Sequence, residues 1–267
     1  VIGAIDGASS ETTSLDFQFN IGLSTSFTGE DSLDIAIDSG NASQSVLGGT
    51  MGFDSGTGLV VDGVTYSFPL GGASMVVGDS TDLSVAFTGA CTYSAFTDAT
   101  PDDCGTGNSL GVGGNGVTAS VGYTFDSGFS LAGGVSSQET QILTKEGTDL
   151  YGIEAAYTTD SYGVAVAYTS ADNGTSAETT YWGVNAFYAP ESTSLPSISV
   201  GVETEETSGS ADKSGYFVGL TWPEVGPGSV SLGLGTQGNF TDAETELLTY
   251  EASYSYPVND GMTVTPG

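Results

Sequence analysis

The sequence predicts an all-β protein: one antiparallel transmembrane β-barrel of about 14–16 strands, with short turns at one rim and long loops at the other. Three observations support this fold class. Apolar and polar residues alternate along many segments, Gly- and Asp-rich turns separate those segments, and short connections alternate with long ones. Alternation gives a strand one apolar and one polar face, because successive side chains point to opposite sides of a sheet. A sheet closed with its apolar face outward can span a membrane around a wet interior.

The N-terminal segments show the alternation clearly. Ser14–Phe27 carries its apolar residues at Leu15, Phe17, Phe19, Ile21 and Leu23. The residues between them are Asp16, Gln18, Asn20 and Gly22. A turn at Thr28–Asp31 leads into Ser32–Gly40, so the two segments predict a hairpin. Val1–Ile5 is expected as one further strand.

The rest of the chain predicts six more hairpins, each joined by a short turn. In chain order they are Val60–Phe68 with Ala73–Val77, Val117–Phe125 with Phe129–Ser136, Asp149–Thr158 with Tyr162–Thr169, Tyr181–Tyr188 with Ser197–Glu205, Gly215–Trp222 with Ser229–Gly235, and Leu248–Tyr256 with Met262–Thr265. No linker divides the 267 residues, which predicts a single domain over residues 1–267.

Longer loops are expected between these hairpins. Those of moderate length are Gln138–Thr148, Ser170–Thr180, Thr204–Ser214 and Thr236–Glu246. Ser80–Gly116 is the longest irregular stretch and contains both cysteines. It either folds into the barrel as a constriction, with Asp98, Asp102 and Asp103 near its tip, or lies outside, and the sequence leaves both options open.

The two faces of the strands differ in size as well as polarity. Tyr and Trp mark many strand ends, which favours aromatic girdles at two membrane interfaces, although aromatic residues are also good strand formers. The opposite face carries small residues, among them Ser120, Gly122, Ala165 and Ala167. A packed interior would need bulky side chains there, so small residues indicate a water-filled lumen.

The charge balance excludes several functions. The chain has 33 acidic residues, only Lys145 and Lys213 as basic ones, and neither Arg nor His, for a net charge of −31. Nucleic-acid partners need clustered basic residues and are excluded. The absence of His removes the commonest general base and zinc ligand. No cofactor is expected apart from Ca²⁺ or Mg²⁺ on surface or lumenal carboxylates, because carboxylates bind cations.

The chain contains no catalytic constellation, and we expect that it is not an enzyme. The adjacent acids Asp102–Asp103 and Glu205–Glu206 are expected to be solvated or cation-binding, rather than a glycosidase pair. The alternation instead places six carboxylates on the polar face of strands as candidate lumen-lining groups: Asp16, Asp34, Asp38, Glu154, Glu203 and Glu251. Such carboxylates would attract cations and repel anions.

Cys91 and Cys104 lie 13 positions apart in the longest loop. In an oxidising compartment they are expected to form a disulfide, which would stabilise the fold by roughly 3 kcal/mol in the chain-entropy model. Free thiols are the alternative, and two Cys without His would make an incomplete metal site.

Three stretches resemble cyanobacterial outer-membrane porins of the OprB-like, carbohydrate-selective family. They are Phe17–Leu33 (FQFNIGLSTSFTGEDSL), Val61–Leu70 (VDGVTYSFPL) and Tyr254–Gly267 (YSYPVNDGMTVTPG). The resemblance implies an outer-membrane barrel that passes small hydrophilic solutes, and by analogy a homotrimer. The family's N-terminal SLH domain and final strand are expected to be absent. Because this chain has no Arg, sugar selectivity is not carried over.

These observations predict a passive diffusion porin of the cell outer membrane with an acidic, cation-favouring lumen. Its expected partners are outer-membrane lipid, small hydrophilic solutes and cations. The alternative is a secreted, acidic, Ca²⁺-binding β-sandwich of a surface layer or an adhesion system. A glycan-degrading enzyme is the weakest possibility.

Overall fold

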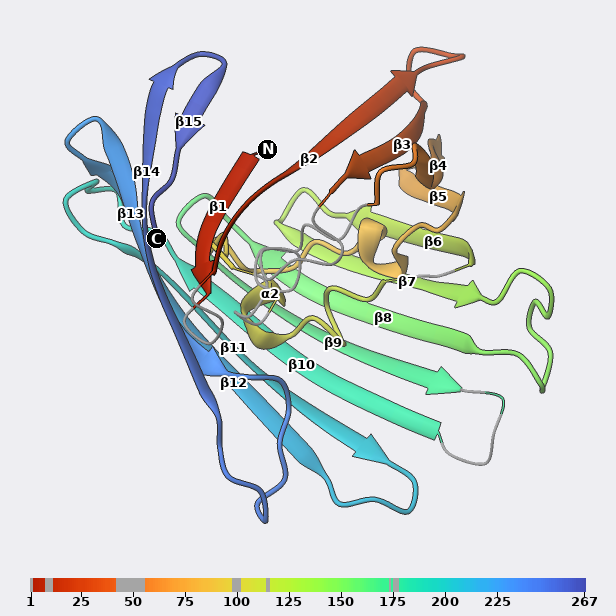
Figure 1. Cartoon of the computed structure of the whole chain (residues 1–267). Helices are drawn as coiled ribbons and strands as arrows, with labels where there is room; N and C mark the ends of the chain where they lie inside the picture. Colours follow the sequence, from red (N-terminus) through yellow and green to blue (C-terminus); the bar gives the residue numbers. More distant parts are fainter. Residues whose placement is uncertain are drawn as a thin grey trace.

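The computed structural model describes residues 2–7, 12–41, 56–97, 102–113, 116–172, 174 and 178–267. They form one antiparallel sheet of 15 strands in which each strand pairs with its neighbours in the sequence. Figure 1 shows this sheet curving around an interior that contains the loop between β5 and β6. The strands are β1 (Ile2–Gly7), β2 (Thr12–Thr25), β3 (Ser32–Gly40), β4 (Val60–Leu70), β5 (Ala73–Asp79), β6 (Val117–Thr124), β7 (Phe129–Ser137), β8 (Asp149–Thr158), β9 (Tyr162–Asp172), β10 (Glu178–Tyr188), β11 (Ser197–Thr207), β12 (Lys213–Val225), β13 (Gly228–Thr236), β14 (Leu248–Asn259) and β15 (Met262–Val264).

The predicted fold class is confirmed, and the alternative of two stacked sheets is wrong for the described residues, which form a single sheet. Sequential antiparallel pairing is the meander expected of an up-and-down barrel. Within the part of the chain that the structure describes, no helix is both long enough and apolar enough to cross a membrane.

The outer face is apolar and exposed, as the alternation predicted. The register places Ile21 of β2 opposite Ile37 of β3, and Val166 of β9 opposite Val184 of β10. Large apolar side chains are exposed around this face, among them Leu15, Phe17, Phe19, Ile21, Leu23, Val121, Tyr123, Val164, Val166 and Val218. Leu220, on the same face of β12 as Val218, is half-buried. Exposed apolar strand faces suit a lipid environment.

Two of the predicted long loops are shorter in the structure. β9 runs to Asp172 and β10 begins at Glu178, while β11 ends at Thr207 and β12 begins at Lys213. Ladder pairing continues through the polar residues of Ser170–Thr180 and Thr204–Ser214, for example between Ser170 and Thr180. Polar composition therefore indicated loops where cross-strand hydrogen bonds extend the hairpins.

The described part of Ser80–Gly116, residues 80–97, 102–113 and 116, is here called the inner loop and folds inside the sheet (Figure 1). It contains the short helix η1 (Leu83–Ala86) and the single turn α2 (Asp102–Gly105). Its apolar residues Ala90 and Leu110 pack against Ala156, Ala165 and Ala167 of β8 and β9. The core of the molecule therefore lies between the inner loop and one wall of the barrel.

Candidate functional site: the lumen and its inner loop

Glu154 of β8 holds the first part of the inner loop. Its carboxylate accepts hydrogen bonds from the backbone N–H of Thr88, at 3.1 and 3.0 Å, and from that of Gly89, at 2.8 Å. The neighbouring wall residue Ser130 of β7 accepts a further bond from the Thr88 hydroxyl at 2.7 Å. A carboxylate that accepts backbone N–H groups makes strong, charge-assisted hydrogen bonds.

Glu251 of β14 holds the next part of the loop in the same way. Its Oε1 accepts the Tyr93 hydroxyl at 2.8 Å and the Phe96 N–H at 2.8 Å. Its Oε2 accepts the Thr97 N–H at 3.0 Å and the Thr97 hydroxyl at 2.9 Å. Burial and the bond to Glu251 raise the pKa of Tyr93 well above the ordinary value for a tyrosine.

Glu203 of β11 binds the returning part of the loop and is only 2% exposed. Its carboxylate accepts hydrogen bonds from Asn108 Nδ2 at 2.7 Å and from Ser109 Oγ at 2.6 Å. Asn239, beyond the end of β13, donates a third bond at 3.0 Å. Glu154, Glu203 and Glu251 therefore project from the lumenal face, where they are covered by the inner loop.

Asn185 of β10 joins both halves of the loop, and sequence reasoning missed it. Its Oδ1 accepts the Ala90 N–H at 2.8 Å, and its Nδ2 donates to Thr106 Oγ1 at 3.0 Å and to the Asp103 carbonyl at 3.3 Å. The side chain is 1% exposed. The available signal was an Asn at a strand position whose lumenal neighbours on β9 are alanines.

Small residues on the lumenal wall allow the inner loop to approach closely. The expectation that these residues line open water is therefore wrong where the loop packs against them. A Cβ on Gly134 of β7 would lie 2.5 Å from Leu83 Cδ1, and one on Gly233 of β13 would lie 2.7 Å from the Tyr93 hydroxyl. Leu83 is fully buried, and the rings of Tyr93 and Phe217 lie 5.0 Å apart. Larger side chains on this wall would displace the loop.

The other three candidate carboxylates lie on the first two hairpin strands. Asp34 and Asp38 share the lumenal face of β3 and stand opposite Ser24 and Asn20 of β2. The Asp34 carboxylate accepts the Ser32 hydroxyl at 2.7 Å. Asp16 of β2 is 8% exposed, and its Oδ2 atom has no hydrogen-bond partner.

The acids proposed for the loop tip are placed only in part. Asp98 lies outside the described residues, and Asp102 opens α2. Asp103 is exposed and its φ is 47°. The φ angles of Cys104 and Gly105 are also positive, at 59° and 77°. Successive left-handed residues cost free energy in an L-chain, so their surroundings must hold them. A disulfide from Cys104 to Cys91, with 5.9 Å between their Cα atoms, and the Asn185 bond to the Asp103 carbonyl do so.

Positive charge near the lumen is scarce. Lys213 Nζ lies 2.9 Å from Glu205 Oε1, and the two residues stand opposite each other at the loop rim of β11 and β12. Glu205 and Glu206 are successive residues of β11, so they point to opposite faces and cannot act as a catalytic pair. Among the described residues, no group of three or more Cys, Asp or Glu side chains could hold a metal ion.

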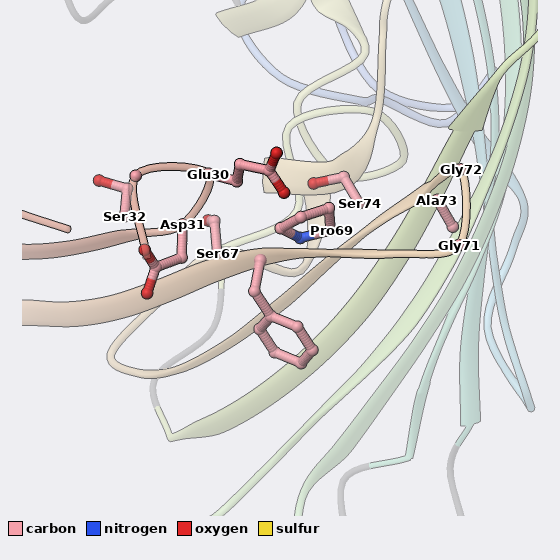
Figure 2. A pocket seen from close by; sticks show the side chains of 11 residues that line it. Glu30, Asp31, Ser32, Ser67, Pro69, Gly71, Gly72, Ala73 and Ser74 are labelled. Carbon is pink, nitrogen blue, oxygen red and sulfur yellow. The ribbon is translucent and has the colours of Figure 1, made fainter. Parts of the chain in front are cut away.

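A hollow of about 780 Å³ lies at the turn rim, between the β2–β3 turn and the β4–β5 turn. Figure 2 shows Glu30 and Asp31 on its edge, with their carboxylates pointing in different directions. Asp31 accepts hydrogen bonds from Ser26, Thr28 and Tyr66, and these donors hold its pKa far below its ordinary value. Asp31 therefore ties the turn to β4 and is not poised for acid–base chemistry.

Comparison with solved structures shows the porin fold. A porin of Rh. blastica carrying three substitutions is 16% identical over 99% of this chain and 89% of its own, with a TM-score of 0.56. A second variant of that porin is 15% identical over 97% and 86%, with a TM-score of 0.55. A structure titled "Asymmetric conductivity of engineered proteins" is 15% identical over 99% and 89%, with a TM-score of 0.56. No protein-family model and no curated protein matches the sequence.

Proposed function

We propose that this chain is a diffusion porin of a bacterial outer membrane. The single observation that carries the proposal is the division of the sheet into an exposed apolar outer face and a polar inner face that holds a folded-in loop. A soluble protein rarely exposes apolar side chains on strand after strand, whereas lipid covers them without penalty. The porin fold of the solved neighbours supports the same reading.

The lumen is proposed to favour cations. Its wall carries Asp34 and Asp38 on β3, the chain has no Arg, and one of its two Lys residues is paired with Glu205. The low-dielectric membrane around a pore concentrates the field of such charges along the water path. The passing solutes are therefore small hydrophilic molecules and inorganic cations.

Three finer assignments belong to the same proposal. The resemblance of Phe17–Leu33, Val61–Leu70 and Tyr254–Gly267 supports membership of the OprB-like porins, and the analogy with porins supports a homotrimer. Ca²⁺ or Mg²⁺ is proposed to associate with surface or lumenal carboxylates, because both ions prefer oxygen ligands.

Conductance across a planar lipid bilayer tests the proposal. Protein purified in detergent should insert and give stepwise current increases, whereas the same protein heated in denaturant before addition should give none. Native folded protein that is soluble without detergent and never conducts would contradict the proposed function.

A further inference from the structure

The lumenal wall differs sharply between its two sides. On β8 to β12 many inward side chains are at most 3% exposed, among them Ala156, Ala165, Ala167, Asn185, Ser199, Glu203 and Phe217. On β2 and β3 the inward residues Asn20, Gly22, Ser24 and Ala36 are exposed. A Cβ placed on Gly22 would meet no atom of the described residues within 4 Å, although one placed on Gly134 or Gly233 would collide with the inner loop.

This difference follows from where the inner loop is bound. Most of its side-chain hydrogen bonds to the wall go to residues of β7 to β14, namely Ser130, Glu154, Asn185, Ser199, Glu203 and Glu251. Thr81, at the start of the loop, also bonds to Thr65 and Val64 of β4 and to Thr118 of β6. The loop therefore fills the space next to that wall. Among the described residues, the space that remains for water lies along the faces of β2 and β3.

The carboxylates divide accordingly into two groups. Glu154, Glu203 and Glu251 are covered, and each accepts several hydrogen bonds from loop atoms. Asp34 and Asp38 are half-buried on the side where Asn20, Gly22, Ser24 and Ala36 are exposed. They stand four positions apart on one strand, which separates them by about 13 Å, a little more than the Debye length in 0.1 M salt. A passing ion therefore meets them in succession.

We propose that solutes pass between the inner loop and the β2–β3 wall, and that Asp34 and Asp38 determine charge selectivity. Glu154, Glu203 and Glu251 are positioning residues that hold the loop and contribute little to selectivity. The inference rests on the proposed porin function. Lys145 and Lys213 both lie at the loop rim, and no residue of β2 or β3 supplies a positive charge.

Reversal potentials in a KCl gradient near 0.1 M test this division. The double variant Asp34→Asn/Asp38→Asn should lower the permeability ratio of K⁺ to Cl⁻ by about two-fold or more, because it removes the fixed charge that ions meet. Glu251→Gln should leave that ratio unchanged and increase the current noise of the open channel, because the loop is held less firmly. The inference is overturned if the Asp variant keeps the wild-type ratio, or if Glu251→Gln lowers the ratio as much.

Chemical labelling supplies an independent measurement in case a charge variant folds poorly. Ala36→Cys in the inserted channel should react with a water-soluble cationic thiol reagent, and the added positive charge should lower the step conductance and the cation preference. Ile21→Cys, which faces outward, should not change either value. A wild-type protein that never conducts would instead remove the porin proposal itself, so the two failures are distinguishable.

Discussion

The hydroxyl of Tyr93 donates a 2.8 Å hydrogen bond to Oε1 of Glu251, which lies 158 residues further along the chain. Tyr93 stands at the middle of the inner loop, and Glu251 stands on the wall strand β14. The Tyr93 ring rests over Gly219 and Gly233 and beside Phe217. The contact therefore links the loop to the C-terminal side of the barrel by both packing and charge.

Removing this hydroxyl should weaken the link without removing the ring. Tyr93→Phe is expected to lower the free energy of unfolding by about 1.5 kcal/mol, the size of a hydrogen bond to a charged group. Urea unfolding in lipid vesicles measures the change. Tyr250→Phe is the matched control, because Tyr250 is 82% exposed on the outer face. Equal losses for both variants would contradict the assigned contact.

The same pair gives a pH dependence. Burial and Glu251 raise the pKa of Tyr93, so the folded state favours the protonated hydroxyl. The stabilisation is fully present below the ordinary tyrosine pKa near 10 and is lost as pH rises through the higher folded value. The stability advantage of wild type over Tyr93→Phe should thus be constant at neutral pH and shrink in strong alkali. An advantage that grows with pH would reverse the expected sign.

The glycines that contact the inner loop mark positions where the wall cannot accept a larger side chain. Gly233→Val should displace Tyr93 and cost about 2 kcal/mol, a usual value for overpacking. Gly22 lies on the same lumenal face but has no described residue within reach of an added Cβ, so Gly22→Ala should be nearly neutral. Unfolding free energies of the two variants decide the matter, and comparable costs would show that the loop does not rest on β13.

A charged side chain on the outward face of the barrel should lower its stability, because the charge would lie in lipid. Val166→Arg on β9 should destabilise the barrel by about 2–4 kcal/mol if the site lies near the bilayer midplane. Ala36→Arg, which points into the lumen, should be mild. Ser120 would be a poor control, because its 3% exposure places it under the inner loop. A mild effect at Val166, measured by unfolding in lipid, would exclude the inside–outside assignment.

The cysteine pair predicts a covalent closure of the loop. Peptide mass spectrometry without reductant should find Cys91 linked to Cys104. The double variant Cys91→Ser/Cys104→Ser should lower the unfolding free energy by roughly 3 kcal/mol. Recovery of both residues as alkylatable thiols in unreduced protein would be incompatible with this closure.

Local periodicity predicted most of the fold. Alternation in segments such as Ser14–Phe27 assigned the inner and outer faces correctly, because side-chain direction in a strand depends only on neighbouring residues. It also placed Glu154, Glu203 and Glu251 on the inner face. The partners of these residues could not be predicted, since Glu251 binds residues more than 150 positions away. Asn185 was missed for the same reason.

Composition gave a wrong expectation for the small residues of the inner face, because composition does not show what packs against them. Small inward residues such as Ala165 and Ala167 predict the lining of an open lumen, although Ala90 and Leu110 of the inner loop pack against them. Small side chains either leave space for water or allow another segment to approach closely. The sequence of one strand cannot distinguish these cases, because the difference lies in a distant loop.

The reversal potential of the wild-type channel in a KCl gradient near 0.1 M tests the account most directly. The acidic lumen predicts a potential that favours K⁺ over Cl⁻. The preference should weaken as salt approaches 1 M, where the Debye length is about 3 Å, and also when millimolar Ca²⁺ occupies carboxylates. A potential of zero, or one that favours Cl⁻, would contradict an acidic water path along the inner face of this barrel.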